Sequence, residues 1–289
     1  MSAFLKTFTI AIIIVSISFT TKKSIGPEYS LVVKKSVKIM SFNLCNDYPG
    51  APEGYLWSER REDVVKLLQK HQPDILCAQE DLVQQGDYMT QAMGWTRTGM
   101  AFNPPSKGAF NGVYFNEDRF SKIQSGMFWL SETPEKYSKG WDAQAVRTCN
   151  WVIMKDKHSR EEIVIFNTHL DHLGNNARIQ SARLILEKIQ EIGQGRPTIL
   201  TGDFNSPRNS SPYQIFAEVM GDSRLIGETS PIGPIPTIVS TGTGSLTSEA
   251  DYIFLKGFNV SKYQAIDDKR ENGRYFSDHI PIMATLTLN

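Results

Sequence analysis

Asp203 and Asn205 lie at the end of a buried, strand-like run and are separated by a single aromatic residue. The run over 198–201 is β-branched or apolar, which is typical of a buried strand, and it breaks at Gly202. Strand periodicity points the carboxylate and the carboxamide the same way and turns Phe204 towards the core. A buried polar side chain needs a hydrogen-bond partner or a ligand. The pair therefore indicates either a binding site or a strand that closes in an Asx turn.

Polar residues flank five further strand-like runs along the chain. They are Asn43, Glu80, His169, Asp251, and Asp278 with His279. If these strand ends meet at one edge, they and the first pair supply four carboxylates, two carboxamides and two imidazoles. Such an oxygen-rich set suits Mg²⁺ or Mn²⁺ rather than Zn²⁺. A histidine that is oriented by a neighbouring carboxylate can take a proton from water, so the set predicts metal-assisted hydrolysis of a phosphoester.

Some members of the set have a simpler interpretation when they are taken alone. Asn43 is compatible with an ordinary turn, and His169 with a satisfied core residue. Glu80 is harder to explain by packing, because a carboxylate that closes a buried strand needs a partner. Arg147 heads an otherwise apolar strand, where it fits either a salt bridge at the strand edge or a contact to phosphate.

Hydrophobic periodicity predicts the elements that position these residues. Strands are expected at 36–44, 74–80, 95–98, 112–115, 120–130, 147–155, 162–171, 198–202, 251–255, 260–266 and 279–288, and helices at 57–71, 82–93, 177–192 and 211–220. Several strands have no helix after them, which argues against a purely parallel sheet. We therefore expect an α+β fold, a four-layer α/β/β/α sandwich of two mixed β-sheets flanked by helices.

Three connecting segments are expected to carry substrate specificity. The segments 99–111 and 225–249 are rich in Gly, Pro and small polar residues and are predicted as exposed loops. The connector 131–146 carries Tyr137 and Trp141. Loops on a rigid scaffold are where binding residues concentrate, so these segments are the ones expected to contact substrate.

The composition excludes some classes of protein. The 289 residues include 31 Lys plus Arg and 31 Asp plus Glu, so no net positive field favours tight, non-specific binding of long nucleic acid, although a local basic groove stays open. The three cysteines, Cys45, Cys77 and Cys149, are too few and too scattered for a disulfide framework. Each lies in or beside an apolar run, and we expect buried thiols.

The amino terminus is predicted to be a targeting segment. Lys6 precedes an apolar run over 8–19, which is shorter than the roughly 20 residues of a membrane-spanning helix and typical of a secretory signal. We assign 1–21 to a signal peptide, with an uncleaved membrane anchor as the alternative, and 22–35 to a leader. Residues 36–289 are assigned to a single catalytic domain. The protein is expected to be secreted or periplasmic and monomeric, with no obligate protein partner.

The order of the polar motifs resembles that of the endonuclease/exonuclease/phosphatase (deoxyribonuclease-I-like) superfamily. The motifs are Asn43, Gln79-Glu80, Asn167-Thr168-His169, Gly202-Asp203-Phe204-Asn205, Asp251-Tyr252 and Ser277-Asp278-His279. The resemblance runs from Val37 to Leu288. A poorly characterised, secreted bacterial branch of this superfamily is further resembled by Trp129-Leu130-Ser131-Glu132-Thr133-Pro134, the Gly140-Trp141-Asp142 turn and Asn167-Thr168-His169-Leu170-Asp171-His172.

The resemblance implies roles for individual residues. Asn43 and Glu80 would hold the divalent metal, and Asp251 and Asp278 are assigned to the same metal site or to orienting His279. The resemblance implies that His279 activates the attacking water or stabilises the phosphorane.

Further roles concern the phosphate. Asp203 and Asn205 would position the attacking water and the phosphate group. His169 would bind a phosphate oxygen or assist the leaving group, and Arg147 would offer bidentate charge to the phosphate.

The sequence therefore predicts a hydrolase that uses Mg²⁺ or Mn²⁺ to cleave a phosphoester. The expected activity is that of a phosphodiesterase or phosphatase acting on a small-molecule or lipid-linked substrate. An extracellular endonuclease or exonuclease acting on nucleic acid is the first alternative. A non-catalytic binding module with the same fold is the remote one.

Overall fold

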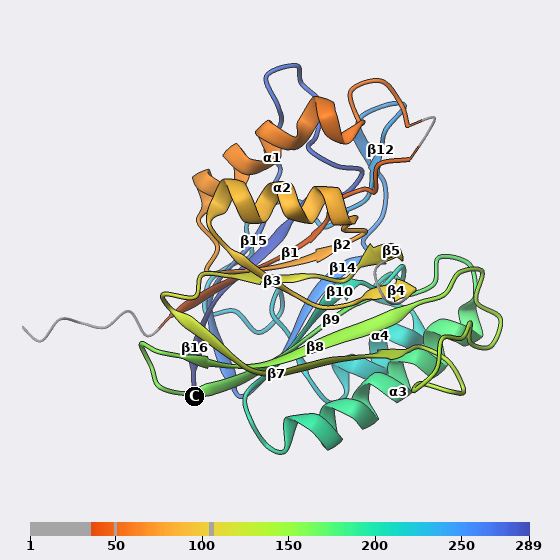
Figure 1. Ribbon diagram of the computed structural model, residues 1–289, viewed down its shortest axis with the longest axis vertical. Helices are drawn as coiled ribbons and strands as arrows, with labels where there is room; N and C mark the ends of the chain where they lie inside the picture. Colours follow the sequence, from red (N-terminus) through yellow and green to blue (C-terminus); the bar gives the residue numbers. More distant parts are fainter. Residues whose placement is uncertain (1–35, 49–50, 104–106) are drawn as a thin grey trace, which may run out of the picture. The chain divides into compact units, whose positions relative to one another are not determined.

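The computed structural model describes residues 36–48, 51–103 and 107–289 (Figure 1). The predicted signal peptide, 1–21, and the leader, 22–35, lie outside the described residues. The first of two large sheets has six strands in the order β15-β16-β1-β2-β6-β3. Their bounds are β1 (Val37–Asn43), β2 (Ile75–Gln79), β3 (Thr96–Thr98), β6 (Val113–Phe115), β15 (Phe258–Ala265) and β16 (Ile282–Leu288).

The second sheet also has six strands, in the order β11-β14-β10-β9-β8-β7. Their bounds are β7 (Phe120–Trp129), β8 (Thr148–Asp156), β9 (Glu162–His169), β10 (Thr198–Asp203), β11 (Gly221–Asp222) and β14 (Asp251–Lys256). Both sheets are mixed, because β1 pairs with β2 and β9 with β10 in parallel while their other neighbours run antiparallel. This confirms the predicted mixture.

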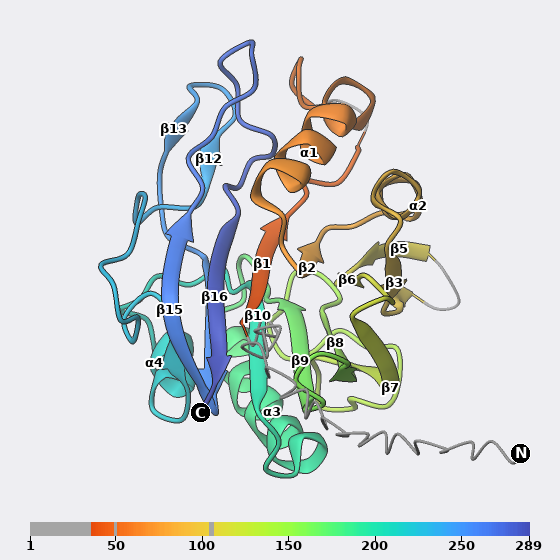
Figure 2. The same ribbon diagram turned by 90° about the vertical axis from the view of Figure 1, so that its left-hand side faces the viewer.

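Helices cover the outer face of each sheet (Figures 1 and 2). Helices α1 (Trp57–His71) and α2 (Val83–Met93) pack on the first sheet, and α3 (Asn175–Gly193) and α4 (Ser211–Ala217) on the second. A third apolar cluster lies between the sheets and joins residues such as Ile39, Ile165 and Ile199. The predicted four-layer sandwich is thereby confirmed.

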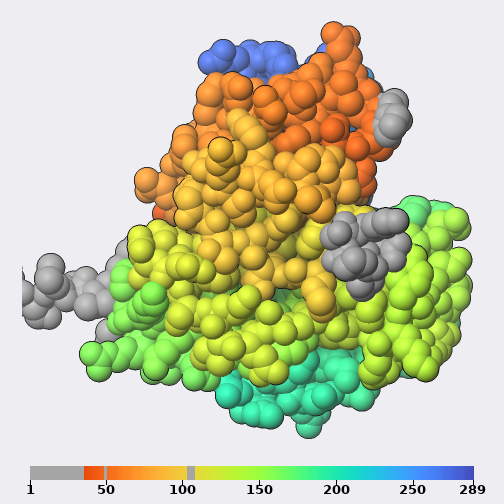
Figure 3. All heavy atoms as spheres, viewed as in Figure 1, coloured from red at the N-terminus to blue at the C-terminus, as the bar shows by residue number. Residues whose placement is uncertain are grey.

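Surface views show the same layering. In Figure 3 the residues of α1 and α2 form the upper part of the face in view, those of α3 form its lower edge, and the strand residues coloured yellow to green lie between them. Among the described residues, none of the helices is both long and apolar enough to cross a bilayer.

Two segments predicted as loops contain short hairpins. In the segment 99–111, β4 (Ala101–Asn103) pairs with β5 (Lys107–Phe110), and in 225–249, β12 (Val239–Ser240) pairs with β13 (Ser245–Leu246). The loop prediction was therefore incomplete, because Gly and small polar residues also mark the turns between very short strands. The three cysteines are buried and free, as expected.

Arg60 is a fully buried cation that ties together three stretches of chain near the ends of β1 and β16. Its guanidinium donates hydrogen bonds to the backbone carbonyls of Leu44, Cys45, Tyr55 and Phe276. Arg60→Met should leave these buried acceptors without a donor and lower the free energy of unfolding by about 3 kcal/mol or more. Urea denaturation measures this change.

The neighbouring Arg61 provides the matched control. It is exposed and lies over the ring of Tyr88, so Arg61→Met should cost less than about 1 kcal/mol. Equal stability losses in the two variants would show that the carbonyl contacts of Arg60 contribute little.

Candidate active site

Strand register brings the predicted polar residues to one edge of the sandwich. Asp203, the last residue of β10, is the parallel partner of His169 on β9 and the antiparallel partner of Asp251 on β14. Asn43 is the last residue of β1, and Glu80 follows β2, the parallel neighbour of β1. Because the carboxyl ends of these parallel strands lie at the same edge, residues separated by more than 150 positions can meet there. Asn43 and Asp203 do so, with a hydrogen bond of 3.1 Å.

Asp203 is the centre of this group. Its Oδ2 atom lies 3.1 Å from Asn43 Nδ2, 3.3 Å from His169 Nε2 and 3.6 Å from His279 Nε2. The side chain is buried, and burial raises the pKa of the carboxyl to about 7, although the nearby His279 opposes this shift. A carboxylate with a pKa near neutrality is suited to taking a proton from water.

The two interpretations of the Asp203–Asn205 pair both hold. The backbone N–H of Asn205 donates to Asp203 Oδ1 at 2.9 Å, and Asn205 has a φ of 46°, so the strand does close in an Asx turn. The turn places Asn205 Nδ2 3.0 Å from the carbonyl oxygen of Leu170 and 3.1 Å from His169 Nε2. The turn is therefore what brings the carboxamide into the site.

His279 is oriented by Asp251. Its Nδ1 atom lies 2.8 Å from Asp251 Oδ2, and both side chains are buried. Burial disfavours the imidazolium, but Asp251 and Asp203 outweigh it and raise the pKa of His279 well above its usual range. His279 therefore favours the protonated form in this surrounding.

Asp278 occupies a different position from Asp251. Its Oδ1 atom accepts a hydrogen bond of 3.1 Å from Ser277 Oγ. Burial, and next Asp278, raise the pKa of the Cys45 thiol to about 12, which places this carboxylate on the Cys45 side of the site. The sequence left open which carboxylate orients His279, and the 2.8 Å hydrogen bond identifies Asp251. The assignment of Asp278 to the metal stays a prediction.

Asn43 and Glu80, the predicted metal ligands, lie together. Asn43 Nδ2 is 3.4 Å from Glu80 Oε1, while Asn43 Oδ1 accepts from the backbone N–H of Cys45 at 2.9 Å. Glu80 has a φ of 55° and accepts from the backbone N–H of Asn46 at 3.0 Å. The amide nitrogen of Asn43 thus faces the Glu80 and Asp203 carboxylates, while its oxygen faces the Cys45 N–H.

Two carboxylates and one imidazole lie close enough together to hold a divalent cation when His279 is neutral. Asp203, Asp251 and His279 each offer a ligand atom within 4.8 Å of the others, and all three are buried. Asp251 Oδ1 is buried and has no hydrogen-bond partner among the described residues, so it is an acceptor that needs a cation or a water. The predicted metal set named Asp251 but not Asp203 or His279 as ligands.

His169 and Arg147 form the other wall of the site. Burial, together with Arg147 and His279 nearby, lowers the pKa of His169 well below its usual range, so this imidazole favours the neutral form. Arg147 Nε lies 3.7 Å from Asp171 Oδ2, and an Nη atom lies 3.2 Å from His172 Nδ1. The contact to Asp171 is the salt bridge that the sequence allowed. Because Arg147 also lines the cavity together with Glu80 and His169, it is also placed for a phosphate contact.

Asp171, which the sequence places beside His169 without a predicted role, is a positioning residue. Its carboxylate accepts backbone hydrogen bonds from Gln144 and Ala145 in the connector and from Leu173 and Gly174 before α3. Burial opposes ionisation, but these donors prevail and lower the pKa of the carboxyl to about 2. In the sequence, its closeness to His169 indicated that Asp171 lies near the site. The hydrogen-bond donors in the connector could be identified from the fold but not from the sequence.

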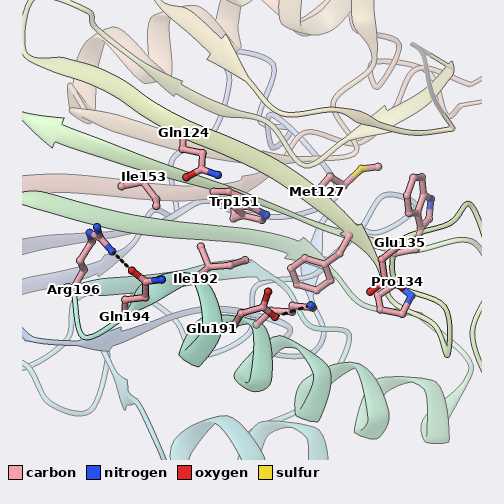
Figure 4. A pocket seen from close by; sticks show the side chains of 13 residues that line it. Gln124, Met127, Pro134, Glu135, Trp151, Ile153, Glu191, Ile192, Gln194 and Arg196 are labelled. Carbon is pink, nitrogen blue, oxygen red and sulfur yellow. Dashed lines mark hydrogen bonds and ion pairs between the residues drawn. The ribbon is translucent and has the colours of Figure 1, made fainter.

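A cavity of about 400 Å³ opens on the site. It is lined by Asn46, Glu80, Phe102, Ala109, Asn111, Tyr137, Ala145, Val146, Arg147, Thr148 and His169. A larger cavity of about 610 Å³ lies between β7, β8 and α3, where Trp151 and Ile153 face Ile192 of the helix (Figure 4). The larger cavity contains none of the predicted catalytic residues.

Comparisons with known proteins agree with this geometry. The statistical model of the Endonuclease/Exonuclease/phosphatase family matches residues 40–279. An endonuclease/exonuclease/phosphatase family protein of Bacteroides thetaiotaomicron is 33% identical, with a TM-score of 0.83 over 88% of this chain and 98% of that chain. A mannosyl-6-phosphatase of the same species is 34% identical, with a TM-score of 0.82 over 87% of this chain and 100% of that chain.

Curated relatives are more distant and longer. Nocturnin of Mus musculus is 25% identical over 270 residues, which are 82% of this chain and 60% of Nocturnin. Protein angel of Drosophila melanogaster is 27% identical over 216 residues, which are 65% of this chain and 57% of that protein. The chain thus spans 57% to 60% of the length of these two relatives.

Proposed function

The chain belongs to the endonuclease/exonuclease/phosphatase family, and from this premise we propose that it is a divalent-metal-dependent phosphatase of small phosphoric monoesters. Members of the family hydrolyse phosphoesters. The observation that carries the proposal is the group around Asp203, in which His279, His169 and Asn43 all lie within 3.6 Å of one carboxylate oxygen. The similarity to a mannosyl-6-phosphatase supports a sugar phosphate as the substrate.

The residues around Asp203 would each stabilise a different charged group of the reaction. Glu80 would hold Mg²⁺ or Mn²⁺ together with Asn43 Oδ1, which keeps a second lone pair beside its hydrogen bond from the Cys45 N–H, and the bound cation would neutralise charge on the phosphate oxygens. Arg147 and the neutral His169 would donate to the phosphate from the opposite wall. With the phosphate held by these donors and the cation, the reaction further requires a group that takes a proton from the attacking water.

Hydrolysis adds the oxygen of one water to phosphorus and breaks the ester P–O bond, whose electron pair stays on the leaving alcohol oxygen. We assign Asp203 Oδ2 as the acceptor of the water proton, which is then passed to the alcohol. The His279 imidazolium, held by Asp251, would stabilise the negative charge that develops on the phosphorane. Asn205 would fix the water and the phosphate relative to Asp203.

A substrate panel tests the proposal. Phosphate release from mannose 6-phosphate, glycerol 1-phosphate and bis-p-nitrophenyl phosphate would be measured beside cleavage of a supercoiled plasmid and an oligoribonucleotide, with Mg²⁺, Mn²⁺ or EDTA. We expect turnover of monoesters that EDTA abolishes. Cleavage of nucleic acid that disappears in Asp203→Ala would favour the nuclease alternative. No metal-dependent turnover of any ester would overturn the proposal.

Glu80→Gln should raise the Mg²⁺ concentration needed for half-maximal activity by at least about tenfold, because the amide is a much weaker cation ligand than the carboxylate. Titrating activity with Mg²⁺ measures this change. Glu162→Gln is the matched control, since Glu162 pairs with Arg196 at the other end of β9. An unchanged Mg²⁺ requirement in Glu80→Gln, or a large loss of thermal stability in EDTA, would assign Glu80 a structural role instead.

A further inference from the structure

We propose that Phe102 and Tyr137 form a stacking surface for the sugar ring of a hexose monophosphate and thereby set which esters are hydrolysed. The inference rests on the proposed function, because it places the leaving group of that reaction. It concerns the part of the cavity that Phe102 and Tyr137 line.

One continuous cavity joins the catalytic wall to these aromatic residues. Glu80, Arg147 and His169 line it, and so do Phe102 and Tyr137. Its volume of about 400 Å³ falls in the range of small-molecule sites, which runs from about 300 to 1,000 Å³. A phosphate held by Arg147 and His169 would therefore have room to extend its ester substituent within the same cavity towards the two aromatic side chains.

Both aromatic residues contact Trp129. Trp129 Nε1 donates to the carbonyl oxygen of Phe102 at 2.9 Å, and the Trp129 ring meets the Tyr137 ring edge-on, with centroids 6.4 Å apart. Tyr137 is 53% exposed, so a large part of its side chain is accessible although its ring contacts Trp129. Phe102 and Tyr137 come from the segments 99–111 and 131–146, two of the three that were expected to carry specificity.

The polar lining fits a sugar better than a purely apolar group. Asn111 Nδ2 donates to the carbonyl oxygen and the hydroxyl of Thr148, while its amide oxygen receives no hydrogen bond from the described residues. Asn46 lies in the same cavity, beside Glu80. A pyranose presents an apolar face of C–H bonds and an edge of hydroxyls. Aromatic rings suit the first and amide groups the second.

Two monoesters that differ only in the leaving group test the inference. Tyr137→Ala should lower kcat/KM for mannose 6-phosphate by about 10- to 100-fold, mainly through KM, as expected for one lost stacking contact. The loss for glycerol 1-phosphate, which has no ring, should stay below about threefold. Tyr137→Phe should behave like the wild type. Ile123→Ala, a change of an equally exposed residue on β7, is the control.

Binding gives a second readout that does not depend on turnover. In titration calorimetry the wild type should bind mannose 6-phosphate more tightly than glycerol 1-phosphate, and Tyr137→Ala should lose this difference. Equal losses for both esters would overturn the stacking role, and so would a preference for adenosine 5′-monophosphate over the hexose ester. Failure of all turnover with the binding difference intact would instead count against the proposed function alone.

Discussion

Asp203→Asn is expected to lower kcat by about 10³-fold while changing the free energy of unfolding by less than about 1 kcal/mol. The carboxylate lies within 3.6 Å of Asn43, His169 and His279 at the same time. Asparagine keeps the acceptor for the Asn205 N–H but cannot take a proton from water. It also removes a buried charge, which limits the cost to stability.

The pH profile separates loss of a base from loss of packing. A base must be unprotonated, so kcat/KM of the wild type should rise with pH until the Asp203 carboxyl is ionised. Burial raises this pKa to about 7, and a bound cation lowers it because it favours the charged form, so the limb should lie at or below about 7. In Asp203→Asn this limb should disappear.

Asp268→Asn is the control for this experiment, because Asp268 pairs with His71 and Lys70 at the end of α1 and lies outside the site. It should keep the wild-type rate and profile. An Asp203→Asn enzyme that retained more than about a tenth of the activity would remove Asp203 from the role of base.

His279→Ala is expected to lower kcat by about 10² to 10³-fold with little change in Mg²⁺ affinity. Its imidazole is held 2.8 Å from Asp251, and its Nε2 atom points to Asp203 at 3.6 Å. Removing it deletes the positive charge that would face the phosphorane. Asp251→Asn should reproduce part of the loss, because it leaves the imidazole without its orienting carboxylate.

Steady-state kinetics and Mg²⁺ titration of each variant distinguish these effects. His71→Ala is the matched control, since His71 also contacts a carboxylate, Asp268 Oδ2 at 2.7 Å, but does so on α1. A near-normal rate in His279→Ala would contradict the assignment. A large rise in the Mg²⁺ requirement would instead make His279 a metal ligand, in line with its place near Asp203 and Asp251.

The sequence predicted the layers and the strand ends well, because both follow from local periodicity. Asp203 and Asn205 were readable as a pair, since a period of two and a breaking glycine define where a strand closes. The prediction could not choose between Asp251 and Asp278 as the partner of His279. Asp278 adjoins His279 along the chain, but the partner in the 2.8 Å hydrogen bond is a residue 28 positions away on β14.

Other features were hidden for the same reason. The carboxylate of Asp171 holds the connector through Gln144 and Ala145, which lie 27 and 26 positions before it. The sequence allowed two roles for Arg147, a salt bridge and a phosphate contact. The fold forms the salt bridge to Asp171, and the phosphate contact stays a prediction. Side chains whose partners are set by register or local turns are predictable from the sequence, whereas those whose partners come from distant loops depend on how the loops pack.

The strand order of the first sheet has a consequence for biosynthesis. The last strand, β16, lies between β15 and β1, and β1 pairs with it from Val37 to Ser41. Until 279–288 has left the ribosome, a nascent chain exposes one edge of β1, and Asp203 lacks His279. Open strand edges favour pairing with other chains. His279 lies just before β16 along the chain, so synthesis of this one stretch both closes the sheet and brings the imidazole to Asp203.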